Sequence, residues 1–465
     1  MAIAIALIVL AGGSVLFYFL SPWHLTPLAS NWGAIDVTIA ISFWVTGLVF
    51  LAVSLFIAVA LIRFRHRRRG RAHYRPENKP LEFWLTAATT LGIGALLAPG
   101  LVVWGHFVTV PDDAHEVEVV GQQWHWSFRF PGKDGVFGEA RNALIDEANP
   151  LGLAPGDPAG RDDVLVEWPI LTLPEGRPVK VLLRSKDVLH NFKVPPFRAK
   201  MDAIPGQVSY FWFTPTRIGD FEAVCAELCG IGHFAMRARV RVVEPARFEA
   251  WLAEQPTHAE RLARPPGDPQ AGEQHYAACT ACHGEKGQGR QATGAPRLAG
   301  LGTDYLVRQL RNFRVGARGT HEQDVQGRQM RPFARSLAGE AAMRDLAAHI
   351  ATLPMGPSPL TVEGDPRQGR RLYRSCANCH GTEGQGDPRY KAPRLAGMND
   401  WYLVRQLEHF RAGIRGRHPR DPYGNQMVDM AQVLVDEAAV RDVVAYINGL
   451  ARADAAQAVA RQAEE

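Results

Sequence analysis

The sequence predicts a multi-domain chain with a transmembrane α-helical hairpin behind an N-terminal apolar helix, then one all-β domain, then two all-α domains. Three observations predict this fold class. Long uncharged apolar runs dominate the first 110 residues, a period-two alternation follows, and the C-terminal part contains a duplicated segment with helical patterning. A chain of 465 residues is also too long for one small hydrophobic core.

Two apolar runs, Val37–Ile62 and Phe83–Val108, have the length of membrane-spanning helices. The loop between them, Arg63–Lys79, holds eight Lys or Arg residues and one acidic residue. Such a basic loop is expected in the cytoplasm, which places everything after Val110 on the outer side of the membrane.

A third apolar run, Met1–Leu20, predicts either a signal peptide or a retained helix. A signal peptide normally begins with a basic region, and this run has none. Small residues at Ala29 and Ser30 leave cleavage open, and we favour a retained helix.

From Glu116 to about Val243, apolar residues alternate with polar ones in short segments separated by Pro and Gly. This pattern is typical of a β-sandwich or barrel. The clearest alternation is in Trp124–Phe130, Val179–Ser185, Val208–Phe213 and Met236–Val242.

An internal repeat fills the C-terminal part. Cys279–Leu353 aligns without a gap on Cys376–Leu450, and 39 of these 75 positions are identical. A repeat of this length indicates a duplicated domain, and blocks such as Glu340–Leu353 indicate small all-α units.

Each repeat opens with Cys-x-x-Cys-His, as Cys279, Cys282, His283 and as Cys376, Cys379, His380. Two thiols on one helical turn can add to the two vinyl groups of a haem, and the adjacent imidazole can bind its iron. Half a zinc site, a redox dithiol or a small disulfide are the alternatives. Two occurrences in an exported helical duplication favour covalent haem.

The iron of each haem needs a sixth ligand. Met330 and Met427 each lie 47 residues after the motif histidine and are the methionines that match across the repeat. A thioether stabilises ferrous iron, as an electron carrier requires. Both could instead be core residues, which is how we interpret the unmatched Met343 and Met430.

A second group of ligand-type residues lies in the predicted β domain. Cys225, Cys229, His233 and Met236 follow one strand, and His190 ends another. Soft sulfur combined with imidazole selects copper or zinc. A structural Cys₂His₂ zinc site is the alternative, but it leaves Met236 without a role.

These motifs carry a resemblance to a known family. Leu81–Met236 resembles subunit II of the haem–copper cytochrome oxidases, and Pro269–Leu450 resembles tandem dihaem cytochromes c. The matching blocks of the first are Gln123-Trp124-His125-Trp126, Asp187-Val-Leu-His190, Met201-Asp-Ala-Ile-Pro-Gly206 and Cys225–Met236.

The resemblance implies a binuclear copper centre, CuA, in a cupredoxin fold, bridged by Cys225 and Cys229. His190 and His233 would each bind one copper. Met236 and the main-chain carbonyl of Glu227 would be weak ligands, and the Glu227 carboxylate would reach a magnesium or manganese ion at the contact with subunit I.

Three further positions follow from the same resemblance. Trp124 matches the tryptophan through which electrons reach the copper, although it can equally be a core residue. Glu82 matches a glutamate near a proton-uptake path, with helix capping as the alternative. Gln122 departs from the His found in many members, which leaves the local docking surface undefined.

The expected function is the electron-accepting subunit of a respiratory cytochrome c oxidase in a bacterial inner membrane. Its partners would be subunit I, subunit III, membrane lipid and a periplasmic donor, either a cytochrome c or a quinol–cytochrome c reductase. The net charge of +5 gives no case for nucleic acid. A nitric oxide reductase subunit and a stand-alone electron carrier are the alternatives.

The linkers suggest an order of electron flow. The first haem unit is joined to the copper domain by a short Pro-rich segment, so tethering predicts the order donor, haem at His380, haem at His283, copper. A chain that folds back would reverse the two haems. The expected segments are 1–30 (apolar helix or signal), 31–110 (hairpin), 111–245 (cupredoxin), 246–268 (linker), 269–354 and 366–451 (cytochrome c units) and 452–465 (tail).

Overall fold

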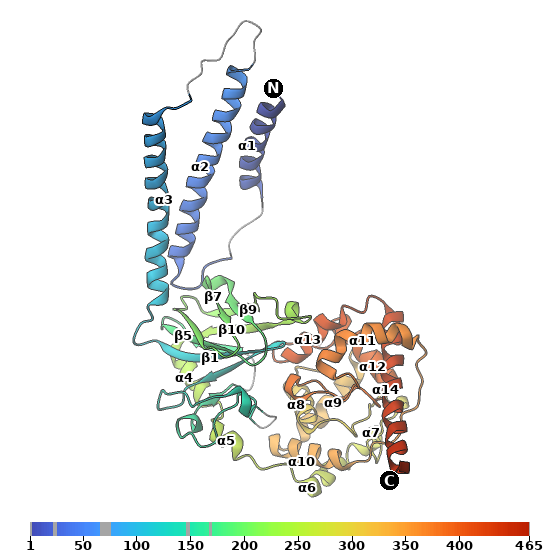
Figure 1. Ribbon diagram of the computed structural model, residues 1–465. Coiled ribbons are helices and arrows are strands. Elements are labelled where there is room, and N and C mark those ends of the chain that lie inside the picture. Colours follow the sequence, from blue (N-terminus) through green and yellow to red (C-terminus); the bar gives the residue numbers. More distant parts are fainter. Residues whose placement is uncertain (1, 22–25, 66–75, 146–148, 167–169, 465) are drawn as a thin grey trace.

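The computed structural model describes residues 2–464 except 22–25, 66–75, 146–148 and 167–169, and side chains up to residue 450 (Figure 1). The basic loop on which the topology prediction rests lies largely outside the described residues. Three long apolar helices stand together at one end of the molecule, and the β-rich and helical parts lie side by side at the other (Figure 1). The fold class agrees with the prediction.

The three N-terminal helices are each long and apolar enough to cross a membrane. Tyr18 of the first packs edge-on against Trp44 of the second, with ring centroids 6.0 Å apart. Their side chains are mostly exposed within this chain, as expected of lipid- or partner-facing surfaces. The helices are α1 (Ala2–Leu20), α2 (Gly33–Arg63) and α3 (Lys79–Val108).

Two five-stranded sheets form the β domain, in the orders β3-β2-β1-β5-β8 and β4-β10-β9-β6-β7. Aromatic residues from both sheets meet between them. Trp126 of β2 packs edge-on against Phe192 of β6 at 5.0 Å. The strands are β1 (His115–Gln122), β2 (His125–Phe130), β3 (Val164–Leu165), β4 (Ile170–Pro174), β5 (Val179–Ser185), β6 (His190–Val194), β7 (Ala199–Ala203), β8 (Ser209–Phe213), β9 (Gly219–Cys225) and β10 (Arg237–Val243).

The segment that leads into α2 fastens the membrane helices to the β domain. The indole Nε1 of Trp32 donates to the carbonyl oxygen of Trp212 at 2.9 Å. Arg198 forms an ion pair with Asp36 in the first turn of α2, at 2.6 Å. The β domain is therefore held directly at one end of the helices. Short helices then lead out of it, namely α4 (Pro245–Ala253) and α5 (His258–Leu262).

The helical part consists of two copies of one arrangement, in agreement with the repeat. In each copy the terminal helix packs across the helix that leads into the Cys-x-x-Cys-His motif, and each copy has its own apolar core. The first copy contains α6 (Pro269–Tyr276), α7 (Thr280–His283), α8 (Thr303–Val315), α9 (Val325–Ser336) and α10 (Gly339–Thr352). The second contains α11 (Pro366–His380), α12 (Asp400–Arg411), α13 (Pro422–Ala431) and α14 (Glu437–Glu464), which continues through the expected tail.

Candidate copper and haem sites

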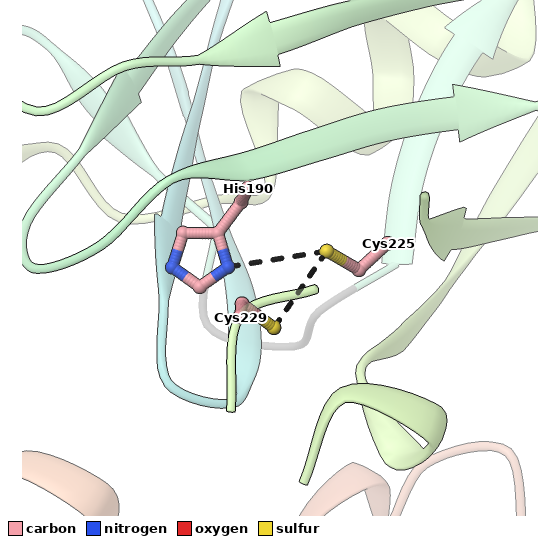
Figure 2. A group of neighbouring side chains, drawn as sticks. All are labelled: His190, Cys225 and Cys229. Carbon is pink, nitrogen blue, oxygen red and sulfur yellow. Dashed lines mark hydrogen bonds between the residues drawn. The ribbon is translucent and has the colours of Figure 1, made fainter. Parts of the chain in front are cut away.

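Two cysteine sulfurs form the centre of the first candidate site. Cys225 ends β9 and Cys229 follows four residues later, and their Sγ atoms lie 3.8 Å apart (Figure 2). A disulfide requires sulfurs about 2 Å apart, so both side chains are free thiols here. Among the described residues, the group of His, Cys, Asp and Glu side chains close enough to share a metal ion consists of His190, Cys225 and Cys229.

A histidine approaches each sulfur from a different direction. His190 begins β6, which pairs with β9, and its Nδ1 lies 4.0 Å from Cys225 Sγ (Figure 2). His233 lies in the short helix η4 (His233–Ala235), and its Nδ1 is 3.5 Å from Cys229 Sγ. Both Nδ1 atoms therefore face the sulfur pair.

The two weaker predicted ligands lie at the same place. Met236 is fully buried, with its Sδ 3.7 Å from Cys229 Sγ. The main-chain oxygen of Glu227 lies 3.2 Å from Cys225 Sγ. All six predicted copper-binding residues are thus brought together by the end of β9, the loop after it and the start of β6.

The protonation of the sulfur pair is consistent with a metal site. The hydrogen bond between the two sulfurs lowers the pKa of Cys225 and raises that of Cys229. Two thiolates at this separation repel each other unless a cation lies between them. Two sulfurs, two imidazoles and a thioether form a donor set suited to copper.

Asp187 was not singled out by the sequence reasoning, although it belongs to this site. Its Oδ1 lies 2.8 Å from His190 Nε2, and Nε2–H donates to it. Such a carboxylate fixes the ring so that the opposite nitrogen faces the metal. The signal was present in the sequence, since Asp187 lies three residues before His190 in the quoted block.

Trp124 and Gln123 hold the ligand loop from outside. The indole Nε1 of Trp124 donates to the carbonyl oxygen of Cys229 at 3.2 Å, and the Gln123 side-chain amide donates to the same oxygen at 2.8 Å. Trp124 is also buried in the domain core. It is therefore the core residue that was the alternative, and it also borders the ligand loop, while its role in electron entry remains a prediction.

Glu82 lies apart from this site. It is in the first turn of α3, at the end of that helix remote from the β domain (Figure 1). Its Oε1 accepts a hydrogen bond from the backbone N–H of Asn78 at 3.2 Å. This is the capping contact that was the alternative to a role in proton uptake, and that role remains a prediction.

The motif histidines of the two repeats are oriented in the same way. His283 Nδ1 donates to the carbonyl oxygen of Pro296 at 2.7 Å, and His380 Nδ1 donates to that of Pro393 at 2.8 Å. This leaves each Nε2 free to bind iron, and the buried His283 Nε2 has no hydrogen-bond partner among the described residues. A buried nitrogen without a hydrogen-bond partner is expected where that nitrogen binds a metal.

The rest of each motif lines a largely apolar cavity that extends through both units. Burial raises the pKa of both Cys279 and Cys376 to about 11, so these thiols are uncharged in an apolar setting. Met330 of α9 and Met427 of α13 line the cavity, and so does Met430, which we interpreted as core. Met343 is buried away from it. The residues present fit a haem in each unit.

The two units also meet each other through a buried polar cluster. Arg318 donates to Gln309 at 2.7 Å and to Tyr402 at 2.9 Å. Its repeat counterpart Arg415 donates to Gln406 at 2.6 Å and to Tyr305 at 3.3 Å. The pairing is reciprocal, so the units pack as a pseudo-symmetric pair.

The haem unit that contacts the copper domain is not the one that tethering predicted. The Gln122 side-chain amide donates to the carbonyl oxygen of Arg389 at 2.7 Å, and the Gln426 side-chain amide donates to that of Trp124. Both Arg389 and Gln426 belong to the second unit. The expectation that the first unit lies beside the copper domain because it is nearer in the chain is therefore wrong about the arrangement in space.

Comparisons with known proteins assign families to these parts. The family described as "Cytochrome C oxidase subunit II, periplasmic domain" matches residues 115–243, and "Cytochrome c" matches 269–354 and 367–451. "Alternative cytochrome c oxidase subunit 2" of Bradyrhizobium diazoefficiens is 57% identical over 259 residues, 56% of this chain and 94% of that relative. "Cytochrome c oxidase subunit 2" of Cereibacter sphaeroides is 31% identical over 215 residues, 44% of this chain and 70% of that relative.

A solved structure is similar in sequence to part of the chain. Reduced recombinant cytochrome c4 from Pseudomonas stutzeri is 28% identical and covers 39% of this chain and 98% of its own, with a TM-score of 0.32.

Proposed function

The chain belongs to the cytochrome c oxidase subunit II family, a subunit of haem–copper oxidoreductases, and on this premise we propose that it is the electron-accepting subunit of a respiratory oxidase. In this proposal a periplasmic donor reduces the haem units, the copper domain receives the electrons, and subunit I uses them. There oxygen is reduced to water and protons are pumped.

One observation carries the proposal. Two cysteine sulfurs lie 3.8 Å apart, and four further potential ligands of a copper pair, contributed by separate strands and loops, converge on them. Such a pair of bridged coppers would share the transferred electron and change geometry little. The chain supplies the rest, since Asp187 orients His190, and Gln123 and Trp124 hold the Cys229 backbone.

The proposed cofactors account for every cysteine in the sequence. Cys225 and Cys229 would bridge two coppers, with His190, His233, Met236 and the Glu227 carbonyl as the other ligands. Two covalent haems would use the remaining four cysteines, with His283 and Met330 on one iron and His380 and Met427 on the other. We further propose that the half-buried Glu227 carboxylate reaches a magnesium or manganese ion at the contact with subunit I.

The proposed setting is the bacterial inner membrane, crossed by the 31–110 hairpin and by the N-terminal helix where it is retained. The cupredoxin domain, 111–245, and the cytochrome c units, 269–354 and 366–451, would then lie in the periplasm. Subunits I and III would pack against the apolar helices, whose side chains this chain leaves exposed.

The test is to purify the complex and compare its consumption of oxygen with that of nitric oxide. Rapid oxygen consumption with water as the product supports the proposal. Consumption of nitric oxide in preference to oxygen would indicate a reductase that uses a similar copper subunit. A chain that purifies loaded but without a catalytic partner would indicate a stand-alone carrier.

A further inference from the structure

The second haem unit is docked on the copper domain next to its ligand loop. Three contacts define the docking face: Gln426 donates to the Trp124 carbonyl, Gln122 donates to the Arg389 carbonyl, and the ring of Tyr423 meets that of His125 edge-on at 5.7 Å. Burial lowers the pKa of His125 to about 3, so this imidazole is uncharged and packs as an aromatic ring. Figure 1 shows α13 beside the β domain.

A short series of contacts links this face to both candidate sites. Trp124 accepts from Gln426 through its carbonyl and donates to the Cys229 carbonyl through its indole. Gln426 immediately precedes Met427 on α13, and α13 packs against the short helix that carries His233. Cys379, one of the two cysteines of the second motif, packs against the hydrophobic core of the β domain.

The repeat itself shows that this face is specific to the second unit. Arg389 and Tyr423 correspond, at an offset of 97 residues, to Ala292 and Gln326. Gln426 corresponds to Gln329, so the residue is the same, but Gln426 is half-buried whereas Gln329 is exposed. The two copies therefore differ where the second contacts the copper domain.

We infer that the C-terminal haem unit, and not the unit adjacent in the chain, is the one that delivers electrons to the copper domain, across the Gln426–Trp124 contact. The inference rests on the proposed function, and it reverses the order that tethering suggested. Each transfer moves one electron: the iron bound by the second unit is oxidised, the copper pair is reduced, and no bond forms or breaks.

A consequence concerns the external donor. The surface beside Trp124 is already covered by a part of this same chain, so a soluble donor protein cannot bind there while the second unit is docked. A donor must therefore bind elsewhere on the chain, and the first unit, which the reciprocal Arg318–Arg415 cluster holds against the second, offers such a surface. Gln426 is a positioning residue in this scheme.

The matched pair Gln426→Glu and Gln329→Glu tests the docking contact in the intact, loaded complex. A carboxylate at 426 cannot donate to the Trp124 carbonyl. An acceptor left unpaired costs enough free energy to shift the docking equilibrium about tenfold towards the undocked state. Hydrogen exchange in the resting complex should therefore quicken by about tenfold at the amides of α13 and of Trp124 in Gln426→Glu only. Unchanged exchange there overturns the docking contact.

The order of transfer is tested in the same variants with subunit I blocked by carbon monoxide. After rapid reduction of the haems, copper reduction, followed by its near-infrared absorbance, should slow by about tenfold in Gln426→Glu and stay unchanged in Gln329→Glu. Both glutamines precede a proposed axial methionine, so a nonspecific effect on haem binding would be common to both. The reverse pattern, or no change in either variant, overturns the inference.

A second variant keeps the test decisive if Gln426→Glu fails to fold. Tyr423→Gln introduces the residue that the first unit has at the equivalent position, and it should also slow copper reduction. Normal copper reduction in a folded Tyr423→Gln complex would contradict the inference. Failure of the proposed function looks different, because the unsubstituted complex would then lack copper or would never transfer electrons from haem to copper.

Discussion

The Nδ1 atom of His283 lies 2.7 Å from the carbonyl oxygen of Pro296, and the same contact recurs in the second unit. Because this hydrogen bond fixes the tautomer and the ring, the opposite nitrogen is presented to the cavity in both units. The cavity also contains one matching methionine per unit, which leads to the first prediction.

Met330→Ala and Met427→Ala should each remove one of two methionine–iron charge-transfer bands, about half of the total intensity, and lower the potential of the affected haem. The thioether stabilises ferrous iron, so its loss favours the ferric state. Near-infrared spectra and a redox titration measure both effects. Met343→Leu is the matched control, since Met343 is buried outside the cavity. Loss of a band on replacing Met430, which does line the cavity, would show that the repeat alignment identified the wrong ligand.

The cofactor content should be two coppers and two covalent haems per chain, because every cysteine is then used. Metal analysis of the purified complex gives the copper content after subtraction of the copper in subunit I. A haem stain on a denaturing gel shows whether haem remains attached to this chain. Zinc in place of copper, or haem that dissociates on denaturation, contradicts the assignment.

The local features of both sites could be predicted from the sequence because their ligands are close together in the chain. Five of the six copper-site positions lie within Cys225–Met236, and each haem motif spans five residues. His190 is the exception, since it lies 35 residues before Cys225 and only the pairing of β6 with β9 brings the two together. Asp187 was missed because its role depends on the direction in which the His190 ring points.

The docking of the second unit could not be predicted in this way. A tether sets the effective concentration of one domain near another, but it does not determine which surfaces bind. The contact joins residues about three hundred positions apart, Trp124 and Gln426, and depends on the shape of both folds. One signal was available, since Gln122 departs from the family pattern at a position that contacts the second unit.

Asp187→Asn should weaken copper binding by about 10- to 100-fold, the usual effect of removing a carboxylate that orients a metal-binding histidine. An asparagine lacks the charge that makes the hydrogen bond from His190 Nε2 strong. Titration of the loaded complex with a copper chelator measures the effect. Asp220→Asn is the control, because Asp220 lies on β9 but pairs with Arg239 and Arg241 at the surface. Equal copper retention in the two variants would contradict the role given to Asp187.

The topology should have the loop Arg63–Lys79 in the cytoplasm and the C-terminal domains outside. Protease added to intact spheroplasts should then cut near the exposed Pro265 and spare the basic loop. Cleavage at both places after the cells are opened is the control for accessibility. Cleavage in the basic loop of intact cells refutes the orientation.

Gly232→Ala should disturb the contact between Trp124 and the copper-ligand loop. A Cβ atom at position 232 would lie 2.4 Å from Cδ2 of Trp124, so the indole or the loop must move. Forced overpacking of this kind costs about 1–3 kcal/mol, and here it acts on the residue that links α13 to Cys229. We therefore expect a lower unfolding temperature, a changed tryptophan fluorescence and slower copper reduction. Gly156→Ala is the control, because a Cβ atom at that exposed glycine meets nothing within 4 Å. Unfolding and copper reduction that match the control would mean that the close approach of the loop to Trp124 has no part in electron transfer.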